Sequence, residues 1–399
     1  MKKSTYFTIA LTAIFMLLIG AVIRFIPITN NERTTVKVGF LLDGDEATPY
    51  SENFLAAIGQ VEAVYGDSFE AVIKYNVKED VVEKPLQELI AEDCDLIFGC
   101  SYGYQYLMKD YAANYPDIQF CQATGDLALQ EPVLSNYHDF MGEIYQGRYI
   151  VGQVAGLKLQ EMIDEGIISV DEAKIGYVAA FPYAEVISGY TAFFLGVRSI
   201  VPEATMEVMY ADTWNDYSIE KQLATELIED GCCIISQHSD TIGPAVACEN
   251  ADSEIPIYHV GYNDSMTEIA PSSSLISCKI NFEPYIESAV EALLANQRIE
   301  DVVDGNVHGD NDVSAGFEKD WVQILDINEV VAPEGTQELV EDSISRFKAG
   351  EITVFKGDYT GVNPDDDTDT IDLRDGYIEN EFRSSPAFDY VLEDVITLK

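Results

Sequence analysis

The chain has 399 residues, and its composition is strongly acidic: 23 Lys and Arg stand against 70 Asp and Glu, a formal net charge of −47 at pH 7. Because nucleic-acid phosphates are bound by Lys and Arg that displace counterions, this balance argues against a nucleic-acid-binding protein. The 47% of hydrophobic residues excludes a disordered chain, and the length allows two domains of ordinary size behind an anchor. We interpret the acidic excess as a solvated surface.

The N-terminal residues contain a long apolar segment. Lys2 and Lys3 precede an uncharged run over residues 4–23, which is about the 20 residues needed to cross a bilayer. The basic flank is expected to stay inside, so the rest of the chain crosses. No small-residue cleavage site and no lipid-accepting cysteine follow the run, which favours an uncleaved signal anchor over a secretory or lipoprotein signal. We therefore expect residues 1–35 to hold an extracytoplasmic domain at the cell membrane.

From residue 36 onward, short apolar strands alternate with amphipathic helices. A first series has predicted strands at residues 36–42, 71–75, 94–99 and 118–121, separated by helices. The glycine-spaced segment 136–160 is predicted to form a helix that packs closely on a neighbour, at a crossing between two domains. The β-α repetition predicts a parallel, doubly wound α/β sheet.

A second β-α series begins at Lys174. Its predicted elements are strands at 174–181, 206–210, 232–237, 257–260 and 275–282, with helices at 185–200, 219–229, 245–250 and 283–296. Residues 313–317 and 321–325 are expected to form a hairpin, followed by a helix over 338–348 and a hairpin-like tail from residue 352.

Motifs for catalysis or metal binding are weak. The sequence has no G-x-S-x-G, no Walker loop and no G-x-G-x-x-G after the first strand. The acidic run 365–369 lacks the glycine and glutamate of a calcium loop, so we interpret it as a solvated turn. The cysteines have no zinc spacing and are interpreted as buried free thiols, with one disulfide left open; they are Cys94, Cys100, Cys121, Cys232, Cys233, Cys248 and Cys278.

Aromatic and polar residues gather in loops that follow predicted strands of both series. The carboxyl ends of parallel strands are the usual place for a ligand in an open α/β sheet. Aromatic faces with carboxylates and amides around them suit a flat heterocycle, and such sites suit hinge closure. The candidate binding residues are Asp43, Tyr50, Ser101, Tyr102, Phe181, Trp214, His238, Asp240 and Asn263.

The second series closely resembles the basic membrane protein family of ABC-transporter solute-binding proteins, in particular its purine-binding branch. The matching segments are GYVAAFPYAEVISGYTAFFLGVRSIVPEA, TWNDYSIEKQLATELIEDG, ISQHSD and GYNDSM, and the likeness extends from about residue 37 to about residue 355. It implies a type I periplasmic-binding-protein fold, with two doubly wound lobes, three crossing strands and a cleft between the lobes. It also implies a purine base or nucleoside as ligand, a permease and an ATPase as partners, and neither catalysis nor a cofactor.

The resemblance also implies roles for the candidate residues. Tyr50 and Trp214 match the aromatics that stack on the base, with Phe181 as a wall of the cleft. The edge of the base is expected to meet the remaining candidates, namely Asp43, Ser101, Tyr102, His238, Asp240 and Asn263.

Three positions depart from the pattern. Tyr50 replaces a more usual Trp or Phe, and Asn263 replaces an acidic residue. The lysine that nucleoside binders place on ribose has no exact counterpart, because Lys279 is one position off and would turn to the other face of its strand. The sequence therefore favours a free base over a nucleoside.

The resemblance also sets the expected domain boundaries: residues 36–140 form a first lobe, 141–262 a second, 263–300 return to the first, and 301–399 return to the second with an acidic extension. Two other functions stay open. One is a ligand sensor of the same fold that signals through a membrane partner. The other is a nucleoside hydrolase, for which only the acidic segment 43–46 could supply metal ligands.

Overall fold

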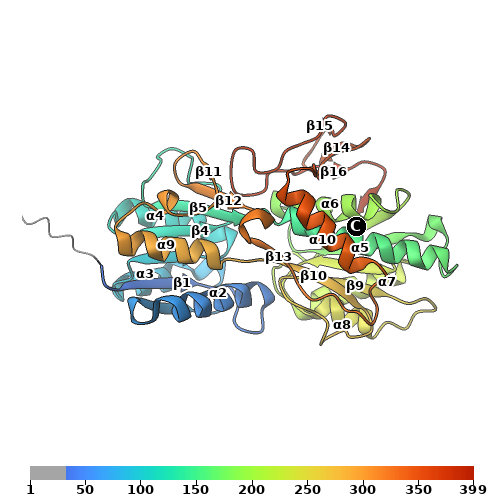
Figure 1. The fold of residues 1–399 in the computed structure, drawn as a ribbon, viewed down its shortest axis with the longest axis horizontal. Coiled ribbons are helices and arrows are strands. Elements are labelled where there is room, and N and C mark those ends of the chain that lie inside the picture. Colours follow the sequence, from blue (N-terminus) through green and yellow to red (C-terminus); the bar gives the residue numbers. More distant parts are fainter. Residues whose placement is uncertain (1–32) are drawn as a thin grey trace, which may run out of the picture.

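The computed structural model describes residues 33–399, and the expected membrane segment over residues 4–23 lies outside them. Figure 1 shows two α/β lobes side by side along the long axis of the molecule, with C-terminal residues running over one lobe towards the boundary between them. None of the helices in the described part of the chain has both the length and the apolarity that a membrane span requires.

The first lobe contains the strands β1 (Val36–Leu41), β2 (Phe69–Lys74), β3 (Leu96–Gly99), β4 (Gln119–Ala123), β5 (Tyr137–Gly142), β11 (Asn306–His308) and β12 (Asp312–Ala315), and the helices α2 (Pro49–Tyr65), α3 (Glu83–Ala91), α4 (Gln105–Asn114) and α9 (Glu283–Ala295). The strand order is β11-β12-β5-β4-β3-β1-β2. In β1, Val36, Val38, Phe40 and Leu41 are all buried. Strands that are apolar on both faces favour parallel pairing under helices, and β1 is parallel to β2 and β3.

The second lobe contains the strands β6 (Lys174–Ala179), β7 (Thr205–Tyr210), β8 (Ile234–His238), β9 (Tyr258–Tyr262), β10 (Ser274–Ile280), β13 (Val322–Ile324) and β17 (Ile396–Leu398), and the helices α5 (Tyr145–Asp164), α6 (Ala184–Arg198), α7 (Tyr217–Glu229), α8 (Gly243–Glu249) and α10 (Thr336–Lys348). Its strand order is β13-β10-β9-β8-β6-β7-β17, in which β10-β9-β8-β6-β7 repeats the order β5-β4-β3-β1-β2 of the first lobe. The edges differ, because β13 is antiparallel to β10 and β17 adds a strand beside β7. The predicted doubly wound, mostly parallel fold is confirmed. Each sheet has a topological switch point, at β1/β3 and at β6/β8.

The segment 136–160 differs from the expected single helix. Its first part is β5, which is buried along its whole length in the first lobe, and α5 begins only at Tyr145. The predicted close packing of its glycines is confirmed. Gly152 of α5 lies against the Phe193 backbone of α6, and Gly196 of α6 lies against the Tyr149 backbone of α5.

The chain passes between the lobes three times, from β5 to α5, from β10 to α9 and from β12 to β13. The later boundaries differ from those expected, because β10 belongs to the second sheet and β11 and β12 belong to the first. The expected hairpin over 313–325 was wrong: β12 pairs in parallel with β5, and β13 pairs with β10 of the other sheet. Each short apolar segment completes an edge of a different sheet, so closeness in sequence is misleading here.

The C-terminal residues form a small sheet of their own. It consists of β14 (Thr360–Asn363), β15 (Asp366–Asp372) and β16 (Val391–Leu392), in the order β15-β14-β16, which confirms the expected hairpin. Phe355 and Phe388 are buried beside this sheet and stack with ring centroids 4.4 Å apart. The acidic residues of β15 are mostly exposed, and no group of three or more potential metal ligands occurs in residues 33–399. All seven cysteines are buried and unpaired.

Candidate ligand-binding site

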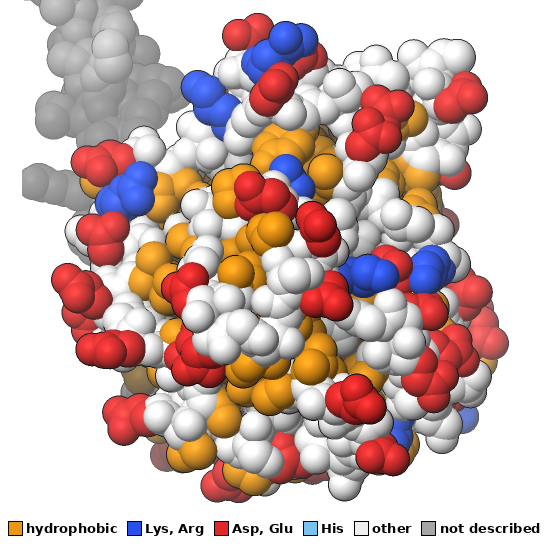
Figure 2. All heavy atoms as spheres, turned by 90° about the vertical axis from the view of Figure 1, so that its right-hand side faces the viewer, with side chains coloured by type: hydrophobic (Ala, Val, Ile, Leu, Met, Phe, Trp, Pro, Cys, Tyr) orange, Lys and Arg blue, Asp and Glu red, His pale blue; other side chains and the backbone are white. Residues whose placement is uncertain are grey.

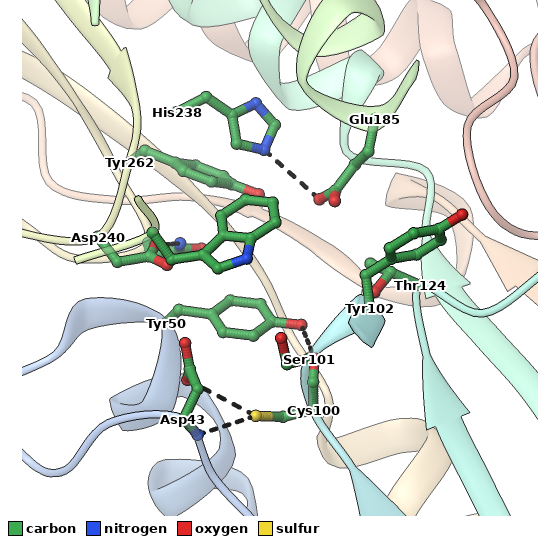
Figure 3. A pocket seen from close by; sticks show the side chains of 12 residues that line it. Asp43, Tyr50, Cys100, Ser101, Tyr102, Thr124, Glu185, His238, Asp240 and Tyr262 are labelled. Atoms are coloured by element: carbon green, nitrogen blue, oxygen red, sulfur yellow. Dashed lines mark hydrogen bonds and ion pairs between the residues drawn. The ribbon is translucent and has the colours of Figure 1, made fainter. Parts of the chain in front are cut away.

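A pocket lies between the two lobes. The unfilled volume between its side chains is about 360 Å³, and the centre of a water-sized sphere can move through about 30 Å³ of it, so the space is narrow. Figure 3 shows the lining, which consists of Asp43, Tyr50, Cys100, Ser101, Tyr102, Thr124, Glu185, Trp214, His238, Asp240, Tyr262 and Asn263.

The lining residues come from the carboxyl ends of parallel strands in both sheets. In the first lobe, Asp43 follows β1, Ser101 follows β3 and Thr124 follows β4. In the second lobe, Trp214 follows β7 and Asp240 follows β8. The two switch points therefore face each other across the pocket, which is where open α/β sheets bind ligands.

Tyr50 and Trp214, the two expected stacking aromatics, are both held in place by other rings. The Tyr50 hydroxyl donates to the Cys100 carbonyl at 3.0 Å, and its ring packs edge-on against Phe54 and Phe282. Phe181 does not line the pocket, contrary to the expected role as a wall. It packs edge-on against Trp214, with ring centroids 5.2 Å apart, and so supports the indole from outside.

Tyr262 forms a further aromatic face that the sequence analysis missed. The buried Arg148 guanidinium lies 3.4 Å from the centroid of the Tyr262 ring, and its Nη1 donates to the Gln237 carbonyl at 2.8 Å. His238 packs against the same tyrosine, with ring centroids 4.8 Å apart. A cation over an aromatic face is favourable, so Arg148 fixes Tyr262 from behind.

Buried carboxyl groups surround these rings. The Asp43 carboxylate accepts a hydrogen bond from Ser51 Oγ at 3.1 Å. Asp240 Oδ1 accepts from Asn263 Nδ2 at 3.2 Å, and Asn263 Oδ1 accepts from Asn53 Nδ2 of α2 at 3.1 Å. An amide at position 263 thus donates in one lobe and accepts from the other, which a carboxylate could not do. Its φ of 67° is also one that Asn tolerates.

Burial shifts the pKa of ionisable groups in the site. It raises the pKa of Asp43, and it raises the pKa of Asp240 well above the ordinary value, with the nearby Asp43 charge as the next cause. Burial and the Arg148 charge lower the pKa of His238 to about 4, so its imidazole is neutral at pH 7. A raised pKa favours the protonated form of a carboxyl group, which can donate a hydrogen bond as well as accept one.

One buried donor is left over in the pocket. The indole Nε1 of Trp214 has no hydrogen-bond partner among residues 33–399. His238 Nδ1 has none there either, but it faces Gly189 of α6, whereas Nε2 lies 3.4 Å from Glu185 Oε1. A buried polar group without a partner costs about 1–3 kcal/mol. A ligand that brought an acceptor to the indole N–H would recover that cost.

Ser101 and Tyr102, also predicted site residues, lie on the first-lobe side of the pocket. Ser101 Oγ donates to Glu79 Oε1 at 2.5 Å, and the Tyr102 hydroxyl lies 3.5 Å from Asp126 Oδ2. Thr124 next to them has a φ of 58°, which is strained for a β-branched residue.

Besides Tyr262, the sequence analysis missed Cys100, Thr124 and Glu185. Each directly adjoins or closely follows a predicted strand end, and that position was the available signal. Their residue types gave none, because a lone Cys, Thr or Glu in a loop is common.

The two-lobed fold and a narrow interlobe pocket at the switch points define the class of ligand-binding proteins that close around a small solute. The chain belongs to the ABC transporter substrate-binding protein family, PnrA-like, whose family model matches residues 35–346. It is therefore an extracytoplasmic binding protein of an ABC transporter and not an enzyme.

Known proteins that resemble the chain differ in what their names say they bind. A purine-binding protein of Brucella abortus is 28% identical over 81% of this chain and 83% of its own length. A putative ABC transporter glucose-binding protein of Haloferax volcanii is 34% identical over 53% of this chain, and the chain spans only 49% of that relative. The solved structure of an ABC transporter solute-binding protein from Conexibacter woesei DSM 14684 has a TM-score of 0.60 at 19% identity, over 80% of this chain and 98% of that one.

Proposed function

We propose that the chain binds a purine through its heterocyclic ring and delivers it to the permease and ATPase of an ABC importer. The observation that carries this proposal is the narrow pocket with aromatic side chains from both lobes, which is surrounded by buried carboxyl groups and contains the Trp214 indole N–H, a donor that lacks a partner among residues 33–399. A purine ring is flat, and its edge alternates N–H donors with nitrogen or oxygen acceptors. Such an edge complements Asp43, Asp240 and the Trp214 indole N–H.

The Brucella abortus relative supports this choice, because it is a purine-binding protein by name and its match to this chain covers 83% of its length. We further propose that residues 4–23 hold the protein at the cell membrane, because a tethered binding protein stays near its permease. A sensor of the same fold would use the same pocket.

Transport and sensing are distinguished by measuring purine uptake in membrane vesicles that contain the permease and ATPase. Uptake that requires this protein supports transport, and uptake that does not require it supports sensing.

A monosaccharide is the second candidate ligand. The glucose-binding relative has the higher identity of the two, though over a shorter match. Carboxylates also accept hydrogen bonds from sugar hydroxyls, and aromatic faces pack against sugar C–H groups.

Isothermal titration of the detergent-solubilised full chain tests these candidates. The ligands are adenine, guanine, hypoxanthine, adenosine and guanosine, with glucose and ribose as the sugar arm. Saturable binding of at least one purine, with no binding of either sugar, is the expected result. Binding of a sugar alone would replace the purine by the second candidate.

A further inference from the structure

The residues that follow α10 lie beyond the part of the chain that the family model covers, which ends at residue 346. We name residues 349–399 the C-terminal extension. It is anchored on the second lobe, where β17 adds to the sheet in parallel beside β7. Lys399 forms ion pairs of 2.8 Å with Glu207 and Asp230, which fix the end of the chain there. The extension is therefore a built part of the folded protein.

The extension also reaches the first lobe. The Ser384 N–H donates to Asp312 Oδ2 of β12 at 2.9 Å, and Arg383 Nη1 lies 3.8 Å from Asp126 Oδ2. Close by in the sequence, Glu379 accepts a hydrogen bond from Ser188 of α6 at 3.1 Å. The extension thus contacts both lobes, and in Figure 1 its dark red segment runs from the right-hand lobe towards the lobe boundary.

A second cavity lies between the extension and the ligand pocket, with an unfilled volume of about 590 Å³. We call it the extension cavity. Arg383 and Ser385 of the extension line it together with residues of both lobes. Tyr102, Thr124 and Glu185 line the extension cavity and the ligand pocket alike, so the two spaces adjoin.

The extension cavity has two polar groups that lack partners. Ser385 is 5% exposed, and its Oγ has no hydrogen-bond partner in the described part of the chain. Arg383 Nη2 donates to the Pro386 carbonyl at 3.3 Å, but the buried Arg383 Nε has no partner there either. Asp126 and Glu185 add two carboxyl groups to the lining. The cavity therefore offers both donors and acceptors.

The chemistry of this lining selects a neutral group with hydroxyls. Hydroxyls donate to the carboxylates of Asp126 and Glu185 and accept from Arg383 and Ser385. A phosphate would face two carboxyl groups against one guanidinium, and like charges repel. The Tyr102 and Tyr183 rings, with centroids 5.5 Å apart, give apolar faces for C–H groups. A pentose has this combination of hydroxyls and C–H faces.

We propose that the extension cavity is a subsite for a neutral, hydroxylated substituent of the ligand, and that Arg383 and Ser385 determine selectivity for it. This inference rests on the proposed function, in which the ring occupies the adjoining pocket. The inference favours a nucleoside over a free base, contrary to the sequence analysis. The sequence analysis favoured the base because the lysine that binds ribose is missing, whereas the C-terminal extension supplies hydrogen-bond donors from a different segment.

The test compares a base with its nucleoside in the detergent-solubilised full chain. Isothermal titration with adenine and adenosine is carried out on the unmodified protein and on the variants Arg383→Gln and Ser385→Ala. We expect adenosine to bind more tightly than adenine. Each variant should weaken adenosine binding about three- to tenfold, the worth of one hydrogen bond, and should change adenine binding less than about twofold. Arg374→Gln, an exposed arginine elsewhere in the extension, is the matched control and should change neither.

Other outcomes would overturn the subsite. They are equal weakening of adenine and adenosine by the variants, or no weakening of either. If another base and its nucleoside bind instead of adenine and adenosine, the same comparison is made with that pair. If the unmodified chain binds none of the five purines, the proposed function fails, and the same variants are titrated with ribose and glucose. Sugar binding that the variants weaken would then support the subsite alone, and absence of sugar binding would refute it as well.

Discussion

Among single residues, Trp214 is expected to contribute most to ligand affinity. It comes from the second lobe, faces the pocket and has a buried N–H without a partner in residues 33–399. Trp214→Ala should weaken purine binding by about 1–3 kcal/mol, the value of base stacking on an aromatic. Isothermal titration measures this. Tyr106→Ala, at an aromatic that is 66% exposed on α4, is the control. Equal purine affinities of the unmodified protein and the Trp214→Ala variant would contradict a stacking role for Trp214.

A second residue, His259, should make stability depend on pH. It is fully buried in β9, with Nε2 3.1 Å from Gln237 Oε1, and burial lowers its pKa to about 3 from 6.5. The unfolded chain takes up a proton below pH 6.5, whereas the folded chain does so only near pH 3. Folded stability is therefore lost as pH falls through this interval, by up to about 1.4 kcal/mol per pH unit.

His259→Gln removes this contribution and keeps a polar side chain. The free energy of unfolding, measured with urea between about pH 4 and 6, should depend less steeply on pH in the variant, by about that slope. Above about pH 7.5, where neither state binds the proton, the two curves should run parallel. Identical slopes below pH 6 would contradict a neutral buried imidazole.

Among the elements, the contact between α5 and α6 depends on the absence of side chains. A Cβ at Gly152 would overlap the Phe193 carbonyl oxygen and lie 2.8 Å from the Phe193 carbonyl carbon. Because backbone atoms cannot rotate away, Gly152→Ala should destabilise the protein by at least about 1–3 kcal/mol, the usual cost of overpacking. The midpoint of urea unfolding reports this loss.

The matched control is Gly59→Ala in α2. An added Cβ at Gly59 meets nothing within 4 Å, so helix propensity alone should act and stabilise the protein by about 0.5–1 kcal/mol. The two substitutions add the same methyl group within a helix. If Gly152→Ala and Gly59→Ala changed the free energy of unfolding by the same sign and size, the two helices α5 and α6 would have moved apart to accept the added methyl group, contrary to the prediction.

For the whole molecule, the excess of negative charge should make stability depend on salt. Figure 2 shows acidic side chains spread over the visible face, with few basic ones between them. Like-charge neighbours cost about 0.2–0.5 kcal/mol each, so ten such pairs would cost about 2–5 kcal/mol. Since the screening length falls from about 10 Å at 0.1 M salt to about 3 Å at 1 M, KCl should raise the free energy of unfolding by an amount of this order.

Thermal and urea unfolding at increasing KCl measure this effect. NaCl should act like KCl and the gain should level off near 1 M, because screening depends on ionic strength. A gain that appears only with sulfate would point to exclusion of the salt from the surface instead. Lower stability at high KCl would contradict the prediction.

The lobes touch across the pocket through contacts from distant parts of the chain. Asn53 donates to Asn263 at 3.1 Å, Lys78 Nζ donates to Asn215 Oδ1 at 3.1 Å, and Tyr102 packs against the Tyr183 ring. These contacts need the lobes to be close together. They make the pocket narrow enough for aromatic rings of both lobes to face one flat ligand.

The sequence by itself determined the local elements and most of the candidate site. The spacing of apolar residues along the chain predicts helices and strands, because side chains repeat every 3.6 residues in a helix and every two in a strand. Residues such as Asp43, Trp214 and Asp240 were predicted to line a site because the carboxyl ends of parallel strands meet at one edge of a sheet. The glycine spacing of α5 likewise predicted a close helix contact, although it did not identify α6 as the partner.

Only the tertiary structure decided the pairings between distant segments. The assignment of β12 and β13 to different sheets, the role of Phe181 behind Trp214, and the position of Arg383 beside the pocket all depend on which surfaces meet after folding. A short apolar strand can pair with many sheet edges, so its sequence does not identify its partner. Arg383 lies in an acidic segment without a regular spacing of apolar residues, so no sequence pattern predicts where it lies. The free energy that favours these contacts comes from removing apolar surface from water between segments that are far apart in the chain. A local sequence pattern carries no information about such distant partners.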